Sequence, residues 1–276
     1  MSMQGTVLIT GCSSGIGLSV AENLKSRGWR VFASARKPQD VARLSAQGFE
    51  ALRLDVCDPA SMERALAILL TLTGGRLDAL VNNAGIAVPG AVEDLSRDSL
   101  QRQFDTNVFG LTDLTRRILP VMRRQGRGRI VMISSILGRV AVPWRGAYTA
   151  SKFALEGLSD TLRLELRGSG IQVALVNPGP VKSRFRDNSL KNFDALVDAA
   201  ASVHAGKYAQ LRSETGARKD DQAFTADPGA VAAKVAHALE SRRPKTRYYV
   251  TLPAYLLATA RCVLPASWLD AVLARI

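Results

Sequence analysis

The stretch Thr6-Val-Leu-Ile-Thr10-Gly11-Cys-Ser-Ser-Gly15-Ile-Gly17 places a short apolar run directly before a glycine-rich turn. Apolar residues at helical spacing follow at Leu18, Ala21 and Leu24, and this pattern ends near Gly28. Glycines let a backbone approach a phosphate, and the first turn of a helix offers unpaired N–H groups and a positive dipole. The order of strand, turn and helix therefore predicts a phosphate-binding site, with a purely structural turn as the alternative.

The alternation of strand and helix patterns continues along the chain. We expect strands at Thr6–Thr10, Arg30–Ser34, Ala51–Leu54, Leu77–Val81, Arg129–Ile133, Ile171–Val176 and Arg247–Val250. We expect further helices at Gln39–Ala46, Pro59–Leu72 capped by Asp58, Ser99–Arg124, Ala147–Leu166 and Pro228–Leu239 capped by Asp227. Such alternation implies right-handed crossovers. The expected fold is therefore α/β: a single domain over residues 1–276 with a Rossmann-type, doubly wound parallel sheet of about seven strands.

The end of the second strand indicates which dinucleotide binds. A site for NAD usually places an acidic residue there to bind the ribose hydroxyls. This chain has Arg36 and Lys37 instead, and two cations suit a 2′-phosphate. We therefore expect NADP(H) rather than NAD(H); two solvated loop charges are the alternative.

Candidate chemistry lies between Ile133 and Leu155. Tyr148 and Lys152 are four residues apart and share one face of the expected helix. A phenol has an ordinary pKa of about 10, and a cation on the same face lowers it. Ser134 or Ser135, at the end of the preceding strand, could orient a carbonyl or hydroxyl toward the phenol. The competing interpretation is an ordinary surface Tyr and Lys.

Composition excludes several classes of function. Cys12, Cys57 and Cys262 are too few and too far apart for a disulfide framework, and with only two histidines we expect no metal and no hydrolase triad. The net charge is +13, but the basic residues are scattered without interleaved aromatics, so we expect a solvated surface and no nucleic acid. The first residues lack a signal-peptide pattern, and we expect a cytoplasmic protein.

Two segments interrupt the α/β rhythm. Residues 180–225 are polar, with short helical pieces expected at Asn192–Ala201 and Ala205–Ser213. They follow the carboxyl end of a strand, where ligands bind in open sheets, so we interpret them as a helical substrate lid; a surface insertion is the alternative. Residues 252–276 form an apolar helical extension that lacks the roughly 18 apolar residues of a spanning helix. We expect it to cover the cleft or a subunit contact, with peripheral membrane contact as a minority interpretation.

Together these motifs resemble the short-chain dehydrogenase/reductase family, in its single-domain branch, from Thr6 to about Val250. The resemblance implies a catalytic set of Asn107, Ser135, Tyr148 and Lys152. It also implies cofactor contacts by Gly11, Ser13, Ser14, Gly15, Ile16, Gly17, Arg36, Lys37, Asp55, Val56, Asn83, Ala84, Gly85, Tyr148, Lys152, Pro178, Gly179, Val181 and Ser183. Ser183 stands where the family often has threonine. Its hydroxyl can still bind the carboxamide of the nicotinamide.

The family's reaction is hydride transfer between a nicotinamide and a carbonyl or secondary alcohol. The resemblance implies that Tyr148 transfers the proton, that Lys152 binds the nicotinamide ribose, and that Asn107 anchors a water chain to Lys152. The segments Ala35-Arg36 and Ser134–Gly138 and the tail resemble members acting on steroids, retinoids or long-chain aldehydes and ketones. An NAD-preferring hydroxysteroid or retinol dehydrogenase and a non-catalytic dinucleotide-binding or sensing protein are the alternatives.

The family also implies an oligomer. Its members commonly form a homodimer or tetramer through the helices that correspond to Ser99–Arg124 and Tyr148–Arg167.

Overall fold

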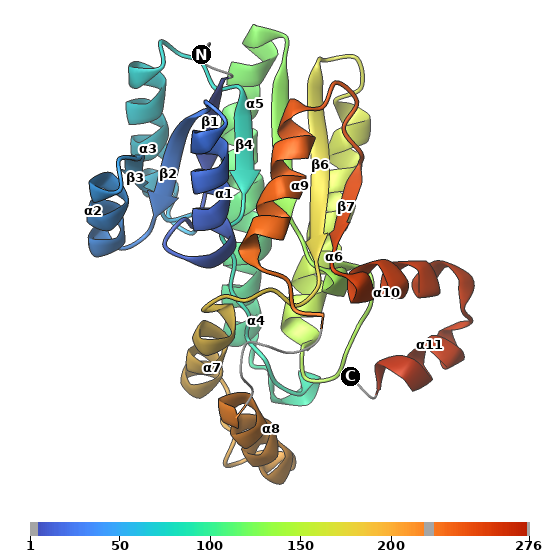
Figure 1. Ribbon diagram of the computed structural model, residues 1–276. Coiled ribbons are helices and arrows are strands. Elements are labelled where there is room, and N and C mark those ends of the chain that lie inside the picture. Colours follow the sequence, from blue (N-terminus) through green and yellow to red (C-terminus); the bar gives the residue numbers. More distant parts are fainter. Residues whose placement is uncertain (1–4, 218–223, 275–276) are drawn as a thin grey trace.

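The computed structural model describes residues 5–217 and 224–274, and its centre is one seven-stranded parallel sheet with the order β3-β2-β1-β4-β5-β6-β7 (Figure 1). The strands are β1 (Thr6–Ile9), β2 (Arg30–Ala35), β3 (Glu50–Arg53), β4 (Ala79–Asn82), β5 (Gly128–Ile133), β6 (Ile171–Pro178) and β7 (Arg247–Val250). The order reverses between β1 and β4, and ligands bind at such a switch point in open α/β sheets. The predicted fold class and the position of every strand are confirmed.

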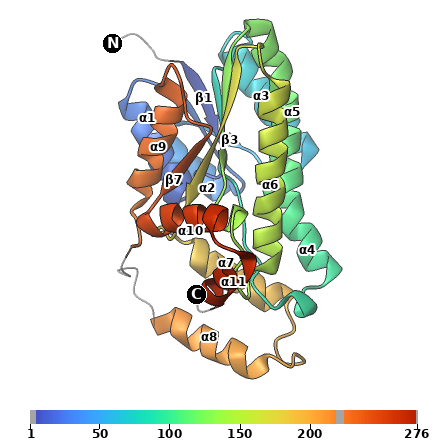
Figure 2. The same ribbon diagram turned by 90° about the vertical axis from the view of Figure 1, so that its right-hand side faces the viewer.

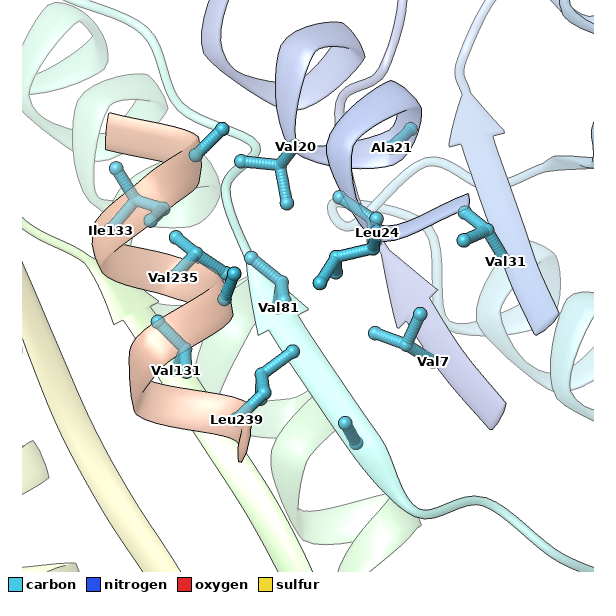
Figure 3. Packing of buried hydrophobic residues seen from close by; sticks show 14 of the residues in the cluster. Val7, Val20, Ala21, Leu24, Val31, Val81, Val131, Ile133, Val235 and Leu239 are labelled. Carbon is cyan, nitrogen blue, oxygen red and sulfur yellow. The ribbon is translucent and has the colours of Figure 1, made fainter. Parts of the chain in front are cut away.

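Helices cover both faces of this sheet (Figure 2). One face carries α1 (Gly15–Ser26), α2 (Pro38–Ala46) and α9 (Pro228–Glu240), and the other carries α3 (Pro59–Leu72), α5 (Gly110–Gln125) and α6 (Gly146–Glu165). In Figure 3, Leu24 of α1 and Val235 of α9 point toward Val81 of β4. Burying such a side chain contributes about 1.5–3 kcal/mol, so these layers fix the strand ends that carry the site.

The two predicted acidic caps behave differently. Asp58 caps α3 as expected, because its carboxylate accepts a hydrogen bond from the Ala60 N–H. Asp227 stands at the cap position of α9, but its side chain makes no capping bond. Its carboxylate lies 3.5 Å from the Lys182 ammonium instead, so the ion pair replaces the predicted cap.

The helix predicted over Ser99–Arg124 is interrupted. The chain forms α4 (Arg97–Phe104), a π-helical turn η2 (Asp105–Phe109) and then α5. The first residue of α5, Gly110, lies against the Val56 carbonyl, which a Cβ at this position would approach to 2.2 Å. This close approach and the wider π turn place Asn107 in the interior, and single π turns are frequent at functional sites.

The expected lid contains α7 (Phe185–Leu196) and α8 (Ala205–Ala217), which extend beyond the carboxyl edge of the sheet (Figure 1). The prediction of Ala205–Ser213 is confirmed, but the first helix begins at Phe185 rather than at Asn192. Its buried face consists of Ser189 and Phe193, and the polar serine weakened the apolar periodicity. Residues 218–223 of the expected lid lie outside the described residues.

The carboxyl-terminal extension forms α10 (Leu252–Val263) and α11 (Ala266–Leu273). These helices pack on the loop that follows β5, in an apolar cluster made by Ile136, Val140, Ala254, Ala258, Leu269 and Leu273. Short 3₁₀ turns lie nearby, η3 (Ile136–Gly138) in this loop and η1 (Val92–Asp94) after β4. Across the described ranges, the length and apolarity that a membrane-spanning helix needs are not found in any helix.

Candidate active site

The glycine-rich turn after β1 depends on its glycines. Gly11 and Gly15 have φ angles of +73° and +59°, a region that side chains disfavour. A Cβ on Gly17 would lie 2.3 Å from the Gly11 carbonyl oxygen, so α1 packs too closely there for any side chain. The chain therefore folds into the phosphate-type turn that the sequence predicted.

Residues at the end of β4 hold this turn in place. The Thr10 hydroxyl accepts hydrogen bonds from the N–H groups of Asn83 and Ala84, both at 2.9 Å. The Asn83 amide donates to the carbonyls of Thr10 and Gly11 at 2.9 and 3.1 Å. The Asn83 side chain is thus committed to the backbone of the turn.

The turn opens onto a hollow suited to an anion. Its lining includes Ser14, Gly15, Ser183 and Arg184, so the segment after β6 reaches the turn after β1. The Ser14 side chain makes no hydrogen bond to the first turn of α1, which leaves the helix N-terminus available to a phosphate. Arg43, which sequence reasoning missed, also lines the hollow and donates to the Ser13 carbonyl at 2.6 Å. These residues fit a dinucleotide pyrophosphate.

The predicted adenosine contacts lie at the ends of β2 and β3. Arg36 is exposed, and its Nε lies 4.0 Å from an Asp55 carboxylate oxygen. Lys37 is exposed at the start of α2, and Val56 is buried beside Asp55. The basic pair predicted to bind a 2′-phosphate is therefore accessible, with one acidic residue nearby.

Ser135 and Tyr148 meet at the carboxyl end of β5. The Ser135 hydroxyl lies close enough to Tyr148 to lower the pKa of its phenol, and it accepts a hydrogen bond from the Leu137 N–H at 3.1 Å. The Ser134 hydroxyl is buried and has no partner among the described residues. The structure thus favours Ser135 over Ser134 as the residue that acts beside Tyr148, as the family resemblance implied.

Burial controls the proton affinities of Tyr148 and Lys152. It raises the pKa of Tyr148 to about 12, because a phenolate is poorly solvated there. It lowers the pKa of Lys152 to about 8, because the ammonium is disfavoured, with Glu156 partly opposing the shift. The Lys152 ammonium donates to the Ile133 carbonyl at 2.8 Å.

The cation that lowers the pKa of Tyr148 differs from the predicted one. Sequence reasoning assigned this effect to Lys152, whose Nζ lies 5.7 Å from the centre of the Tyr148 ring. In the structure, the groups that oppose the effect of burial on the Tyr148 pKa are the Ser135 hydroxyl and the guanidinium of Arg145. Arg145, immediately before α6, was not among the predicted residues.

Asn107 is buried and tied to both neighbouring segments. Its amide donates to the Ile86 carbonyl at 3.0 Å and to the Ser151 hydroxyl at 3.1 Å, and its oxygen accepts from the Ile86 N–H at 2.8 Å. The Ser151 hydroxyl in turn donates to the Tyr148 carbonyl at 2.7 Å. Asn107 thus contacts α6 through Ser151, and its predicted water link to Lys152 stays a prediction.

The segment after β6 connects the site to the lid. The Gly179 N–H donates to the Val250 carbonyl at 3.0 Å, and a Cβ on Gly179 would lie 2.3 Å from the Thr251 hydroxyl. Val181 pairs with Ala226, and the Ser183 hydroxyl accepts from the Phe185 N–H at 3.3 Å. The predicted residues Pro178–Ser183 therefore lead from the sheet edge directly into α7.

A doubly wound sheet with a phosphate turn at its switch point and a Ser–Tyr–Lys group at the next strand end is the architecture of an oxidoreductase. The chain belongs to the short chain dehydrogenase family, whose model matches residues 5–194.

Named relatives agree with this assignment. The uncharacterized oxidoreductase YbbO of Escherichia coli strain K12 is 43% identical over 271 residues, which cover 98% of this chain and 94% of that protein. Human retinol dehydrogenase 5 is 36% identical over 282 residues, covering 97% of this chain and 87% of that protein. The crystal structure of a short chain dehydrogenase/reductase from Burkholderia phymatum in complex with NAD is 27% identical, with a TM-score of 0.78 over 94% of this chain and 92% of that one.

Proposed function

We propose that the protein transfers a hydride between the nicotinamide of NADP(H) and the carbonyl carbon or secondary alcohol of a hydrophobic substrate. The observation that carries this proposal is that Ser135 and Tyr148 lie together beside the buried Lys152, on the same sheet edge as the glycine turn. The relative named retinol dehydrogenase and the relative that holds NAD support the reaction class.

When bound, NADP(H) would supply or accept the hydride. Ser135 holds the substrate oxygen by a hydrogen bond. Tyr148, a neutral phenol at physiological pH because its pKa is about 12, donates its proton to that oxygen as the carbonyl carbon is reduced. In the oxidative direction the Tyr148 phenolate, formed when the phenol releases its proton to solvent, receives the proton of the alcohol. Lys152 lies one helical turn away on the same face and holds the nicotinamide ribose, and Asn107 fixes α6 through Ser151.

Apolar and aromatic side chains support a hydrophobic substrate. The Phe185 ring of the lid lies 5.6 Å from the Tyr148 ring, centre to centre. The same helix, α7, contributes Phe193 to a buried apolar cluster with Val88 and Leu95, and Trp144 packs against that cluster. Steroids, retinoids and long-chain aldehydes or ketones are the proposed substrate classes, and NADPH oxidation against each class is the screen that separates them.

The replacement Tyr148→Phe tests the proposed chemistry. It removes the proton donor while leaving the ring contact with Phe185, so kcat should fall by about 10²–10⁴-fold or more. Binding of NADPH, measured by its fluorescence, should survive. The exposed Tyr255→Phe is the matched control and should keep wild-type turnover. Retained activity in Tyr148→Phe would refute the role of Tyr148, and full loss of catalysis in both variants would point to a defect in folding.

The preference for NADP(H) rests on Arg36 and Lys37, because no acid stands at the end of β2. A charge-assisted bond to a 2′-phosphate implies that Arg36→Ala raises the KM for NADPH by about 10- to 100-fold, with little effect on NADH. Arg242→Ala, at the amino-terminal edge of the sheet, is the control. Equal effects of Arg36→Ala on both cofactors, or a wild-type enzyme that prefers NADH, would support the NAD-dependent alternative.

We also propose a cellular location and an oligomeric state for the enzyme. We place it in the cytoplasm as a homodimer formed through α5 and α6, because Phe109, directly before α5, and Phe153, Leu158 and Leu164 on α6 are exposed. Exposed Leu256 and Trp268 on α10 and α11 support peripheral contact with a membrane as a second role of the extension.

A non-catalytic dinucleotide sensor is the competing class of protein, and turnover in the substrate screen would exclude it.

A further inference from the structure

Arg145 lies beside the candidate proton donor and under the lid. It directly precedes α6, about one helical turn before Tyr148. Its guanidinium Nη1 lies 3.4 Å from the Ser189 hydroxyl of α7, and the same helix places Phe185 against Tyr148. One lid helix thus contacts both residues. On the proposed function, Arg145 therefore lies within the substrate site.

The backbone around Arg145 is held in an unusual conformation. The preceding residue, Trp144, has a φ of +64°, which is rare for a residue with a bulky side chain. The Trp144 ring packs edge-on against His204 and Tyr208 at 5.1 and 5.9 Å, and its carbonyl accepts the Gly90 N–H at 3.0 Å. Such strain persists where surrounding contacts fix it, and it is concentrated at functional sites.

Among the described residues, no carboxylate forms an ion pair with Arg145. Several other partly buried arginines pair with carboxylates, such as Arg30 with Glu50, Arg117 with Asp113 and Arg247 with Glu156, whereas Arg129 bonds to Gln172 and to the Ser241 carbonyl. Within the described part of the chain, Arg145 has no ion pair and only the long bond to Ser189. Burial lowers the pKa of Arg145, interaction with Tyr148 opposes this shift, and nearby Arg186 on α7 adds to it. A partly desolvated cation that has no carboxylate partner is costly, so this arrangement favours an anionic ligand.

Neither Tyr148 nor the cofactor supplies that counter-charge. The pKa of Tyr148 is about 12, so its phenol is neutral at physiological pH. The hollow suited to the pyrophosphate is lined by Ser14, Gly15, Ser183 and Arg184, and Arg145 is not part of it. The remaining source is the substrate.

We propose that Arg145 binds a carboxylate carried by the substrate within a few bonds of the reacting carbonyl. The planar guanidinium matches a carboxylate through paired hydrogen bonds, and the aromatic lid covers an apolar remainder. The substrate class is thus an oxo acid with an apolar tail, or the matching hydroxy acid in the oxidative direction. This inference rests on the proposed function and narrows its substrate class.

A matched pair of probes tests it, 4-oxodecanoate and its methyl ester, with decanal as a neutral aldehyde. Wild-type enzyme should favour the acid over the ester by about 10- to 100-fold in kcat/KM, the range of a hydrogen bond between charged groups. Arg145→Met should bring the ratio of the two kcat/KM values close to one, and Arg145→Lys should keep part of it. Arg242→Met is the control and should keep the wild-type ratio.

Each outcome separates this inference from the proposed function. Reduction of decanal or the ester without any preference for the acid overturns the role of Arg145 and leaves the function standing. If Arg145→Met lowers kcat/KM equally for the acid and the ester and also shifts the pH profile, Arg145 acts on Tyr148 rather than on the substrate. That outcome also overturns the proposed role of Arg145. If none of the three carbonyls nor any in the wider screen is reduced, the proposed function itself fails. The wild-type ratio needs no variant, so it stays decisive if Arg145→Met does not fold.

Discussion

Lys152 shows how one buried side chain couples the site to pH. Its ammonium has the Ile133 carbonyl as a partner, and its nearest acid, Glu156, is engaged elsewhere. The Glu156 carboxylate accepts bonds from the Asn177 amide at 2.6 Å and from the Arg247 Nε at 2.8 Å. Because Glu156 offsets only part of the cost of burial, the pKa of Lys152 falls to about 8.

The pKa of Lys152 predicts that the reaction with NADPH depends on pH. Lys152 loses its charge as the pH rises through about 8, so kcat/KM for NADPH, which reports ionisations of the free enzyme, should fall above that pH. Glu156→Gln removes the charge that raises the pKa of Lys152, so the falling limb should move to lower pH. Glu165→Gln, at the last residue of α6, is the matched control. A profile that stays flat to pH 10, or a limb that Glu156→Gln moves upward, would contradict this account.

Some residues of the site could be predicted from the sequence, and others could not. The spacing of Tyr148 and Lys152 and the motif around Asn107 are local, and the structure brings these residues to one sheet edge. Arg145 was missed because its place in the site depends on contacts with α7, some 40 residues further along the chain. The role of Asn83 in holding the turn was hidden for the same reason, since its partners lie in the turn that follows β1.

Among the helices and strands, the predictions were correct where consecutive residues of one segment are buried. The strands are short apolar runs enclosed on both faces, so their positions follow from composition alone. The π turn at Asp105–Phe109 was missed because its cause, the contact of Gly110 with Val56, joins distant segments. The start of α7 was misplaced because the helix buries Ser189 beside Arg145 and Phe193 against Tyr208 of α8, rather than an apolar stripe against the sheet.

At the scale of the whole molecule, α6 presents a surface suited to a second copy of the chain. Phe153 and Leu164 lie on its outer side with 41% and 55% of their area exposed. Gly157 stands between them in mid-helix, where a Cβ would meet nothing within 4 Å. An interior glycine destabilises a helix by about 0.5–1 kcal/mol relative to alanine, a cost that close approach of a partner helix would explain.

We therefore expect a homodimer that a charge on this surface breaks. Two 29.7 kDa chains should elute together, and Phe153→Asp should raise the dissociation constant of the dimer by about tenfold or more, because the carboxylate is desolvated at the contact. Light scattering during size-exclusion chromatography measures both masses. Val203→Asp, which changes an 85% exposed side chain between α7 and α8, should leave the dimer intact. Dissociation by Val203→Asp but not by Phe153→Asp would move the interface from α6 to the lid, and a monomeric wild type would remove the interface altogether.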